Sequence, residues 1–252
     1  MDFVRNIYVR YLRPRIKPGI SRQRFKLLWH VWGYVPLVLL PSLSMKEKLF
    51  FLRRFLTIDW FVEHAHKPSE ILTLFQALIS RPARPGEVVV EAGCWKGGSS
   101  AKFSLLCRRF GYKLHIFDSF EGVEPGHAEP GAYDFSFEYK AGKEEVEYNL
   151  QKFGDLSVCV LHKGWFKDSF REPFKLPVRL VYIDCDLASG TQEVLRGCLP
   201  ELSPDGVVFT QDFHIKAIRS MLEDPETWKD SPRGKPEIQY RTGHLAELWF
   251  KQ

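Results

Sequence analysis

Short apolar runs and amphipathic stretches alternate along the chain from residue 87 onward. Runs rich in β-branched and aromatic residues predict strands at residues 88–91, 113–118, 157–162, 179–184 and 206–212. Apolar positions at helical spacing predict helices between and after them, at residues 99–110, 143–153, 190–199 and 215–222. Strands that alternate with helices and are almost continuously apolar are typical of a parallel sheet covered on both faces.

The two ends of the chain depart from this alternation. Residues 237–240 and 245–250 flank a short turn and predict a terminal hairpin, which makes the expected sheet mixed. Before the sheet, helices are predicted at residues 45–58 and 70–80, the second with Pro68 in its first turn or Ser69 as its N-cap. The expected organisation is a helical N-terminal extension, residues 1–84, followed by an α/β domain, residues 85–252.

The end of the first predicted strand carries the strongest candidate chemistry. The strand ends at Glu91, and Gly93, Gly97 and Gly98 lead into a helix. The spacing E-x-G-x-x-x-G-G differs from the G-x-G-x-x-G of dinucleotide enzymes, but the unpaired N–H groups of a helix start remain accessible to a ligand. Asp118 ends the second strand, where a carboxylate can accept hydrogen bonds from both ribose hydroxyls. This order of elements predicts that this half of the sheet binds a nucleoside.

Further polar side chains follow the later strands. Asp184 and Asp186 come after the fourth predicted strand, and Asp212 and His214 come after the fifth. Because ligands of open parallel sheets bind at the carboxyl ends of the strands, these side chains are expected to meet there. One acid at a strand end is often only a helix cap, but acids after four of the five strands favour a functional site.

Five motifs in this order resemble the macrocin O-methyltransferase family. They are EAGCWKGGSS at 91–100, FDSFEG at 117–122, KGWFKD at 163–168, YIDCDL at 182–187, and LSPDG at 202–206 followed by QDF at 211–213. The resemblance covers about residues 85–215. It implies a Rossmann-like class I methyltransferase fold and S-adenosylmethionine-dependent methylation of a sugar hydroxyl on a natural product.

The resemblance also implies which residues hold the cofactor. The implied set is Glu91, Gly93, Trp95, Lys96, Gly97, Ser99, Asp118, Ser119, Phe120, Gly164, Trp165 and Asp184. Glu91 and the glycine turn would hold the methionine part, Asp118 would take the ribose, and Gly164 with Trp165 would lie near the adenine. Trp165 has a second interpretation as a core aromatic residue.

A divalent metal belongs to the same implied site. In the family, Mg²⁺ is held by an acid at the position of Asp184 and by an acid pair after the fifth strand, and the acid at Asp186 acts as general base. Carboxylate oxygens suit Mg²⁺, which would orient the acceptor hydroxyl and lower its pKa. Here the pair is Gln211-Asp212, so weaker metal binding is expected. His214 is a second candidate base, or a ligand for a softer metal.

Charge is concentrated at one end of the chain. The net charge is +5, but residues 1–30 hold eight Lys or Arg and one acid, which leaves −2 for the remainder. A nearly neutral body argues against nucleic-acid binding. Residues 1–18 place apolar side chains on helical faces, which favours a packing or dimerisation helix and leaves peripheral contact with an anionic membrane as the alternative. The apolar run at residues 27–45 is interrupted by Pro36 and Pro41 and falls short of the roughly 20 residues of a spanning helix.

The remaining patterns bear on compartment and acceptor. Five cysteines without a C-x-x-C pair predict free thiols and no zinc site, and the start of the chain lacks a signal-peptide pattern, so a cytoplasmic location is expected. Aromatic residues alternate in the long connection at residues 122–139, which predicts a lid over the acceptor or an extra hairpin.

The leading hypothesis is a metal-assisted O-methyltransferase of a small glycosylated or polyhydroxylated acceptor. Two alternatives stay open at this point. One is a metal-independent methyltransferase of another small acceptor, and the other is a non-catalytic protein that binds the cofactor and a partner.

Overall fold

The computed structural model describes residues 30–126 and 134–251. The chain divides between Phe61 and Val62 into two compact units, each described here by itself. The basic stretch at residues 1–18 lies outside the described residues, as do residues 127–133 of the long connection. The boundary expected between residues 84 and 85 stays a prediction.

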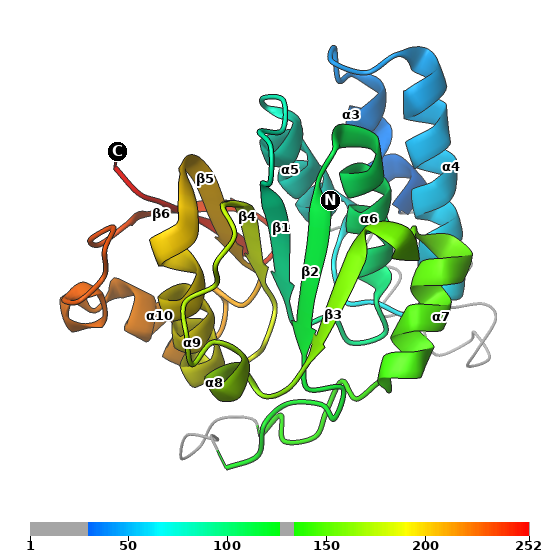
Figure 1. Cartoon of the computed structure of the whole chain (residues 1–252). Helices are drawn as coiled ribbons and strands as arrows, with labels where there is room; N and C mark the ends of the chain where they lie inside the picture. Colours follow the sequence, from blue (N-terminus) through cyan, green and yellow to red (C-terminus); the bar gives the residue numbers. More distant parts are fainter. Residues whose placement is uncertain (1–29, 127–133, 252) are drawn as a thin grey trace, which may run out of the picture. The chain divides into compact units, whose positions relative to one another are not determined.

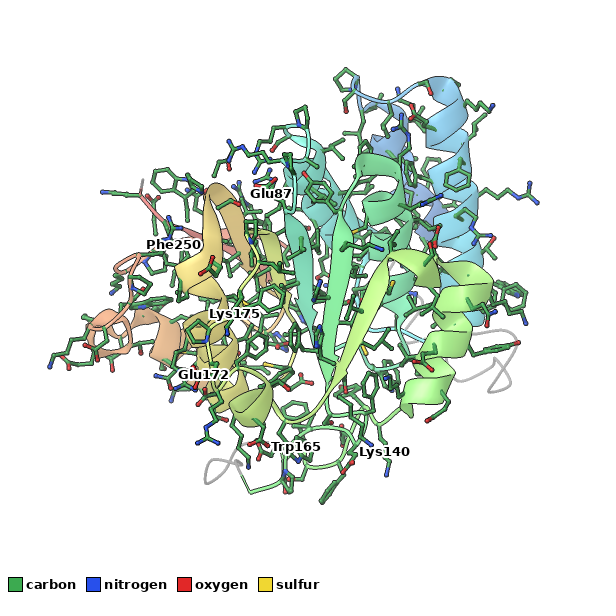
Figure 2. All side chains as sticks on the ribbon, viewed as in Figure 1. Glu87, Lys140, Trp165, Glu172, Lys175 and Phe250 are labelled. Carbon is green, nitrogen blue, oxygen red and sulfur yellow. The ribbon has the colours of Figure 1, made fainter. Side chains whose placement is uncertain are left out.

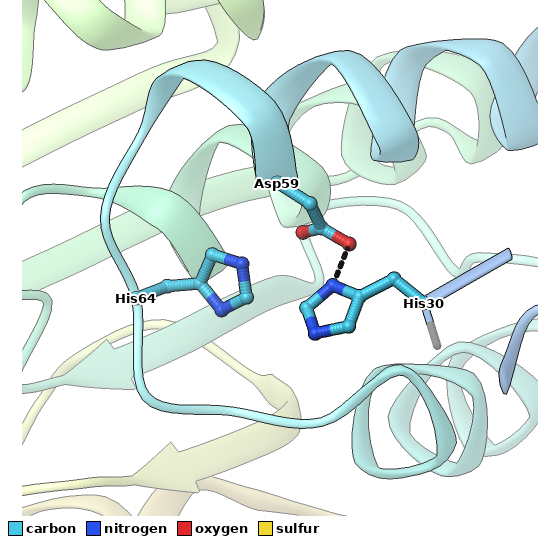
Figure 3. Close-up of side chains that lie close together, drawn as sticks. All are labelled: His30, Asp59 and His64. Carbon is cyan, nitrogen blue, oxygen red and sulfur yellow. Dashed lines mark hydrogen bonds and ion pairs between the residues drawn. The ribbon is translucent and has the colours of Figure 1, made fainter. Parts of the chain in front are cut away.

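The described part of the first unit contains two helices, α3 (Val35–Val38) and α4 (Met45–Phe61). Its core is aromatic: the ring of Phe55 lies 5.6 Å from that of Tyr34 and 5.8 Å from that of Phe51, measured between centroids. Near the end of α4, Asp59 Oδ2 lies 2.7 Å from His30 Nδ1 (Figure 3). None of the described helices combines the length and apolar character needed to cross a bilayer.

The second unit is built on one seven-stranded sheet within the described residues (Figure 1). The strand order is β3-β2-β1-β4-β5-β7-β6. The strands are β1 (Val88–Ala92), β2 (Lys113–Asp118), β3 (Cys159–Lys163), β4 (Val178–Ile183), β5 (Leu202–Thr210), β6 (Glu237–Thr242) and β7 (Leu245–Trp249). Strands β1 to β5 are parallel, and β7 runs antiparallel to both β5 and β6. The mixed sheet predicted from the sequence is confirmed.

Helices cover both faces of this sheet. On one side α6 (Gly98–Phe110) packs against α5 (Pro68–Ile79) and α7 (Lys143–Phe153), and on the other α9 (Ala188–Cys198) packs against α8 (Phe166–Ser169) and α10 (Lys216–Glu223) (Figure 1). Short 3₁₀ helices lie at Leu156–Val158, Leu199–Glu201 and Pro225–Trp228. Every residue of β1 and β4 is buried, as expected of central strands with helices on both faces.

The strand order positions the functional site. Strand β1 pairs with β2 on one side and with β4 on the other: the chain adds β2 and β3 on one side of β1 and then crosses to β4 on the other side. A crevice opens outside the carboxyl ends of the strands at such a reversal, and it is the usual ligand site of open α/β sheets. The acids predicted after the second, fourth and fifth strands all lie at this edge.

The opposite edge of the sheet is held by a polar network around Glu87. Arg81 donates to Glu87 at 2.5 and 2.7 Å and to Asp205 at 2.5 and 2.9 Å, and Ser203 Oγ donates to Glu87 at 2.7 Å. Figure 2 shows Glu87 at the end of the strands opposite Trp165. Burial alone would raise the pKa of Glu87, but the hydrogen bonds from Arg81, the Arg84 backbone N–H and Ser203 outweigh it and lower this pKa to about 2.

Replacing Glu87 with glutamine is therefore expected to cost stability without disturbing ligand binding. The loss at pH 7 should be about 3 kcal/mol, because Arg81 loses a buried ionic partner. Since the folded-state pKa is depressed, the stabilisation is present above pH 4.5 and disappears as the pH falls toward about 2. Urea unfolding across this range should show the difference between variant and wild type shrinking. The exposed control Glu226→Gln should change stability by less than about 0.5 kcal/mol at any pH.

The long connection after β2 forms no hairpin ladder in its described parts. Val123 and Ser136 form a single parallel bridge. Two backbone hydrogen bonds support it, from Val123 N to the Glu138 carbonyl (3.0 Å) and from Phe137 N to the Val123 carbonyl (2.9 Å). This bridge closes the base of the loop beside the ligand edge of the sheet.

Candidate active site

A cavity of about 260 Å³ lies at the carboxyl ends of the parallel strands. Its walls come from the turns after β1, β2, β3, β4 and β5, from the β6–β7 turn and from the long connection after β2. The sequence-predicted residues on its wall are Gly93, Trp95, Ser99, Asp118, Ser119, Gly164, Trp165, Asp184, Asp186, Gln211, Asp212 and His214. The fold thus brings together side chains spread over more than half of the sequence.

The glycine turn after β1 is shaped by close packing against β4. Gly93 has φ +86°, and a Cβ at this position would lie 1.8 Å from the carbonyl oxygen of Asp184. Gly97, also left-handed at φ 76°, is the N-cap of α6. Only glycine fits the first position, and the first two residues of α6, Gly98 and Ser99, line the cavity.

Asp118 organises the wall next to this turn. Its Oδ2 accepts a hydrogen bond from Cys94 N (2.8 Å) and its Oδ1 accepts one from Phe120 N (2.7 Å). Burial raises the pKa of Asp118, while the backbone donors oppose that rise. The carboxylate therefore fixes the backbone on both sides of the crevice between β1 and β2, and it also lines the cavity.

Glu91 lies behind the glycine turn and does not line the cavity. It is fully buried, and none of the described residues hydrogen-bonds either of its carboxylate oxygens. Burial raises its pKa to about 7, partly offset by the nearby Ser100 and Ser99 hydroxyls. Three other residues of the implied cofactor set, Lys96, Gly97 and Phe120, are also outside the cavity lining.

Three carboxylates gather after β4 and β5. Burial raises the pKa of Asp184, Asp186 and Asp212, in the case of Asp186 to about 8, and the charge of Asp212 raises the other two further. The Tyr182 hydroxyl lies 3.2 Å from Asp184 Oδ2 and 3.3 Å from Gln211 Oε1. No Lys or Arg among the described residues lines the cavity beside this acid cluster.

Asp212 has a positioning role that the structure makes explicit. Its Oδ2 accepts hydrogen bonds from the backbone N–H groups of Cys185 and Asp186, each at 2.9 Å. Asp186 has a left-handed backbone with φ 60°, a conformation that costs an ordinary residue roughly 1 kcal/mol. The Asp212 carboxylate thus holds Asp186 in place at the cavity wall.

Aromatic residues of the long connection reach the cavity. Phe135 and Tyr139 line it, and the Tyr139 ring meets Trp95 edge to face at 5.3 Å. Trp95 and Tyr139 both have positive φ, 46° and 54°. Left-handed non-glycine residues are often found at ligand sites, where the surrounding structure holds them.

The structure adds residues that the sequence patterns did not single out. His244, in the β6–β7 turn, lines the cavity and lies 4.0 Å from His214 between ring centroids. Its backbone N–H donates to Glu70 Oε1 at 2.9 Å, so the buried Glu70 of α5 anchors the turn. The only sequence signal for His244 is its place in a turn between two strands.

A second unforeseen segment, residues 63–66, crosses the start of α6. Glu63, His64 and His66 line the cavity, and a Cβ on Gly98 would lie 2.8 Å from the Cβ of His64. The rings of His64 and His66 stack at 4.1 Å. Lys96, which lies within the glycine turn, forms an ion pair with Glu63 at 2.9 Å.

The sequence model of one methyltransferase family, macrocin O-methyltransferase (TylF), matches residues 72–231. The chain belongs to the macrocin O-methyltransferase family. The matched residues run from within α5 through β5 and past the 3₁₀ helix that follows α10, so they include every strand end that lines the cavity except the β6–β7 turn.

Two curated relatives align with the chain over a little more than half its length. The 8-demethyl-8-(2,3-dimethoxy-α-L-rhamnosyl)-tetracenomycin-C 4′-O-methyltransferase of Streptomyces olivaceus is 31% identical over 151 residues. The mycinamicin III 3″-O-methyltransferase of Micromonospora griseorubida is 27% identical over 158 residues. The matched regions cover 56% and 57% of this chain and 58% and 61% of the two relatives, less than two thirds of either.

Solved structures of methyltransferases share the fold. The O-methyltransferase NovP matches with a TM-score of 0.60 and 18% identity over 91% of this chain and all of that protein. A TDP-rhamnose 3′-O-methyltransferase of calicheamicin biosynthesis gives 0.51 and 17%, over 93% and 97%. At these identities the likeness establishes the class I methyltransferase fold of this macrocin O-methyltransferase family member.

Proposed function

We propose that this protein is an S-adenosylmethionine-dependent O-methyltransferase that methylates a hydroxyl of a sugar or glycoside, with the help of Mg²⁺. The observation that carries the proposal is the acid cluster Asp184, Asp186 and Asp212, which lies on the same cavity wall as the glycine turn of a methyltransferase fold. Membership of the family and the sugar-methylating names of both curated relatives support it.

The residues around the glycine turn fit the cofactor. The side-chain-free surface at Gly93 and the start of α6 would accept the methionine part, Asp118 the ribose, and Gly164 with Trp165 the adenine side. When bound, the cofactor supplies a methyl group on a positively charged sulfur. Because S-adenosylmethionine carries a net positive charge, the acidic wall favours its binding.

The donor set after β4 and β5 fits Mg²⁺. Asp184, Asp212 and the amide oxygen of Gln211 offer the hard oxygen ligands that this ion takes. Burial raises the pKa of both Asp184 and Asp212, and the charges of Asp212 and Asp186 raise the pKa of Asp184 further, an effect that a bound cation would relieve. Bound there, Mg²⁺ would supply positive charge beside the acceptor hydroxyl.

Within this site the chain's own residues orient the acceptor and accept its proton. Asp186 would take the proton of the acceptor hydroxyl, and a pKa of about 8 suits a general base near neutral pH. Asp212 holds the Asp186 backbone through two N–H donors at 2.9 Å. Phe135 and Tyr139 would shield the reacting groups from water.

A metal-independent methyltransferase remains the second candidate, and two observations favour it. Gln211 is neutral where the family resemblance implies an acid. In the described residues, the carboxylate oxygens of the three acids do not all lie within 4.8 Å of one another. In this version Asp186 would accept the proton and no cation would bind between Asp184 and Asp212.

Replacing Asp184 with asparagine is expected to separate these two versions. In EDTA the variant should be at least as stable as wild type, because one charge is removed from a buried group of repelling acids. Folding raises the pKa of Asp184, so the folding stability of wild type falls as the pH rises from the unfolded-state pKa to the folded-state pKa of this group. The variant lacks this titration and should lose less stability over the same range. Saturating Mg²⁺ should stabilise wild type by about 2–3 kcal/mol and leave the variant unchanged. Thermal unfolding with Mg²⁺ and with EDTA measures this.

Calorimetric titration of S-adenosylhomocysteine in both buffers completes the test. Binding to wild type and to Asp184→Asn, with a separate Mg²⁺ signal in wild type alone, supports the metal-assisted enzyme. Binding without any Mg²⁺ signal favours the metal-independent one. If neither protein binds S-adenosylhomocysteine, the methyltransferase proposal fails. The exposed Asp230→Asn is the control, and it should behave as wild type in every buffer.

A further inference from the structure

Helix α4 of the first unit has apolar side chains on two sides. Phe51, Phe55 and Ile58 are buried and form its packed side. A second set lies three or four positions apart, a spacing that places its members on one helical face. This set, the α4 stripe, consists of Met45, Leu49, Leu52, Leu56 and Trp60. A surface helix of a globular protein normally has a single apolar side, so the α4 stripe exceeds what the packing of this unit requires.

An open hollow of about 580 Å³ runs along the α4 stripe. Among the described residues its walls come from α4 alone, namely Leu49, Leu52, Arg53, Leu56, Thr57, Trp60 and Phe61. Helix α3 packs beside α4 (Figure 1) but contributes nothing to the hollow. Leu49 is 58% exposed. An apolar stripe left open in this way marks a surface that binds another molecule.

The segment before α4 exposes apolar side chains as well. Trp32 is 75% exposed and Leu39 is 76% exposed. Of the sixteen exposed large apolar side chains in the described part of the chain, nine lie within residues 31–61. The apolar surface is therefore concentrated in the first unit, and it includes tryptophan, which is enriched where proteins meet the boundary between lipid and water.

The charged residues that border the α4 stripe are basic. Arg53 lines the hollow, and Lys46 lies seven residues earlier, on the same side of α4. The two acids of α4 have partners of their own. Glu47 Oε2 accepts hydrogen bonds from the Ser44 hydroxyl (2.6 Å) and backbone N–H (2.9 Å), and Asp59 lies 2.7 Å from an imidazole nitrogen. Basic side chains beside an apolar helix face are typical of a helix that lies on an anionic membrane.

The charge of the whole chain is divided in the same sense. Residues 1–61 contain twelve Lys or Arg and three acids, a net charge of +9. The total is +5, so residues 62–252 carry −4. An anionic lipid surface therefore attracts the first part of the chain and not the second.

A second copy of this chain matches the α4 stripe less well. In a two-fold contact the stripe would meet itself, which brings Arg53 and Lys46 close to the same residues of the other copy. Like charges close together across an interface oppose association. A bilayer that contains anionic lipids offers apolar chains and negative headgroups together, so it matches both the apolar residues and the basic border.

We propose that the first unit binds peripherally to an anionic membrane surface through the α4 stripe. Leu49, Leu56 and Trp60 enter the boundary between headgroups and acyl chains, and Arg53 contacts the negative headgroups. This binding requires neither cofactor nor acceptor in the cavity of the second unit, so it is independent of the proposed function.

Co-sedimentation of the full chain with lipid vesicles tests the proposal. Phosphatidylcholine vesicles with about 30% phosphatidylserine should bind the protein at least about tenfold more tightly than pure phosphatidylcholine vesicles. Raising the salt from about 0.05 M to about 0.5 M should weaken this binding by about tenfold or more, because salt screens the headgroup charge. Absence of binding to the anionic vesicles at the lower salt overturns the proposal, and so does equal binding to both kinds of vesicle.

Leu49→Gln tests the apolar contact. Glutamine is a good helix former and residue 49 is exposed, so the variant should keep the wild-type fold. Its affinity for the anionic vesicles should fall at least about fivefold. The control Leu176→Gln makes the same change at an exposed site of the second unit and should bind as wild type. If the two variants, both native by circular dichroism, bind equally well, the α4 stripe is not the contact surface.

Arg53→Gln tests the basic border of the stripe. It should weaken binding to the anionic vesicles by about fivefold, the usual contribution of one basic side chain at such a surface. Arg171→Gln removes the same charge at an exposed site of the second unit and should have no effect. Equal affinities in these two variants contradict the assignment of Arg53 to the headgroups.

Sedimentation velocity without lipid tests the second copy as the occupant. Wild type, Leu49→Gln and Leu176→Gln should have the same oligomeric state. A dimer that dissociates in Leu49→Gln alone, in a protein that binds no vesicles, would identify the α4 stripe as an interface between copies and overturn the proposal.

Discussion

Replacing Asp186 with asparagine is expected to lower kcat for methyl transfer by a factor of roughly 10² to 10⁴, the usual contribution of a general base. Asparagine keeps the size of the side chain and tolerates the left-handed backbone (φ 60°) seen at this position. The two hydrogen bonds from the 185 and 186 backbone N–H groups to Asp212 do not involve the replaced carboxylate. The fold and the cofactor site should therefore survive while proton acceptance is lost.

The measurement is single-turnover methylation of the methyl hexoside that wild type methylates fastest, together with calorimetric titration of S-adenosylhomocysteine. Affinity for S-adenosylhomocysteine should stay within about threefold of wild type. The exposed Asp230→Asn, which makes the same chemical change outside the cavity, should retain wild-type rates. A loss of kcat of less than about tenfold in Asp186→Asn would mean that another group accepts the proton. His214 is the second candidate base that the sequence offers.

The fold was predictable because local patterns and topology rules agree over residues 87–222. Each predicted strand there is present with ends shifted by a few residues, as at β1, predicted at 88–91 and found at Val88–Ala92. The apolar runs specify strands, the helices between them require parallel crossovers, and crossovers are right-handed. The hairpin β6–β7 followed from two short runs that flank a turn. Its position beside β5, with β7 inside and β6 at the sheet edge, depends on pairing that no local pattern encodes.

Much of the candidate site followed from the same logic. Asp118, Asp184 and Asp212 end or follow three parallel strands of one sheet, so the sheet itself brings them to one edge. The sequence could not show which of these acids line the cavity and which hold the surrounding backbone through hydrogen bonds. Asp212 does both, because its carboxylate also accepts the two backbone N–H groups of the turn after β4.

The residues missed by sequence patterns reach the cavity through tertiary contacts. His244 lines it because Glu70, distant in sequence, fixes the β6–β7 turn. The segment that carries His64 and His66 precedes the sheet and meets the start of α6 at Gly98. Glu91 is fully buried and does not line the cavity, and its expected role at the cofactor stays a prediction.

The glycine turn offers the second large effect, in Gly93→Ala. The new Cβ would lie 1.8 Å from the Asp184 carbonyl oxygen, a backbone atom that can move only if the end of β4 moves. The expected cost is about 3–5 kcal/mol of folding stability. Because Asp184 and Asp186 directly follow β4, the same displacement should weaken S-adenosylhomocysteine binding by more than about tenfold.

Gly126 provides the matched control, since it has the same φ of +86° but nothing within 4 Å of the position its Cβ would take. Gly126→Ala therefore bears the cost of a left-handed alanine, about 1 kcal/mol, without a clash. Urea unfolding and S-adenosylhomocysteine titration of both variants separate the two causes. If Gly93→Ala and Gly126→Ala lose the same stability, backbone strain accounts for the requirement at residue 93. A larger loss of stability in Gly93→Ala, accompanied by weaker S-adenosylhomocysteine binding, means that the close approach of the turn after β1 to the end of β4 keeps the glycine turn and the acid cluster correctly positioned relative to each other.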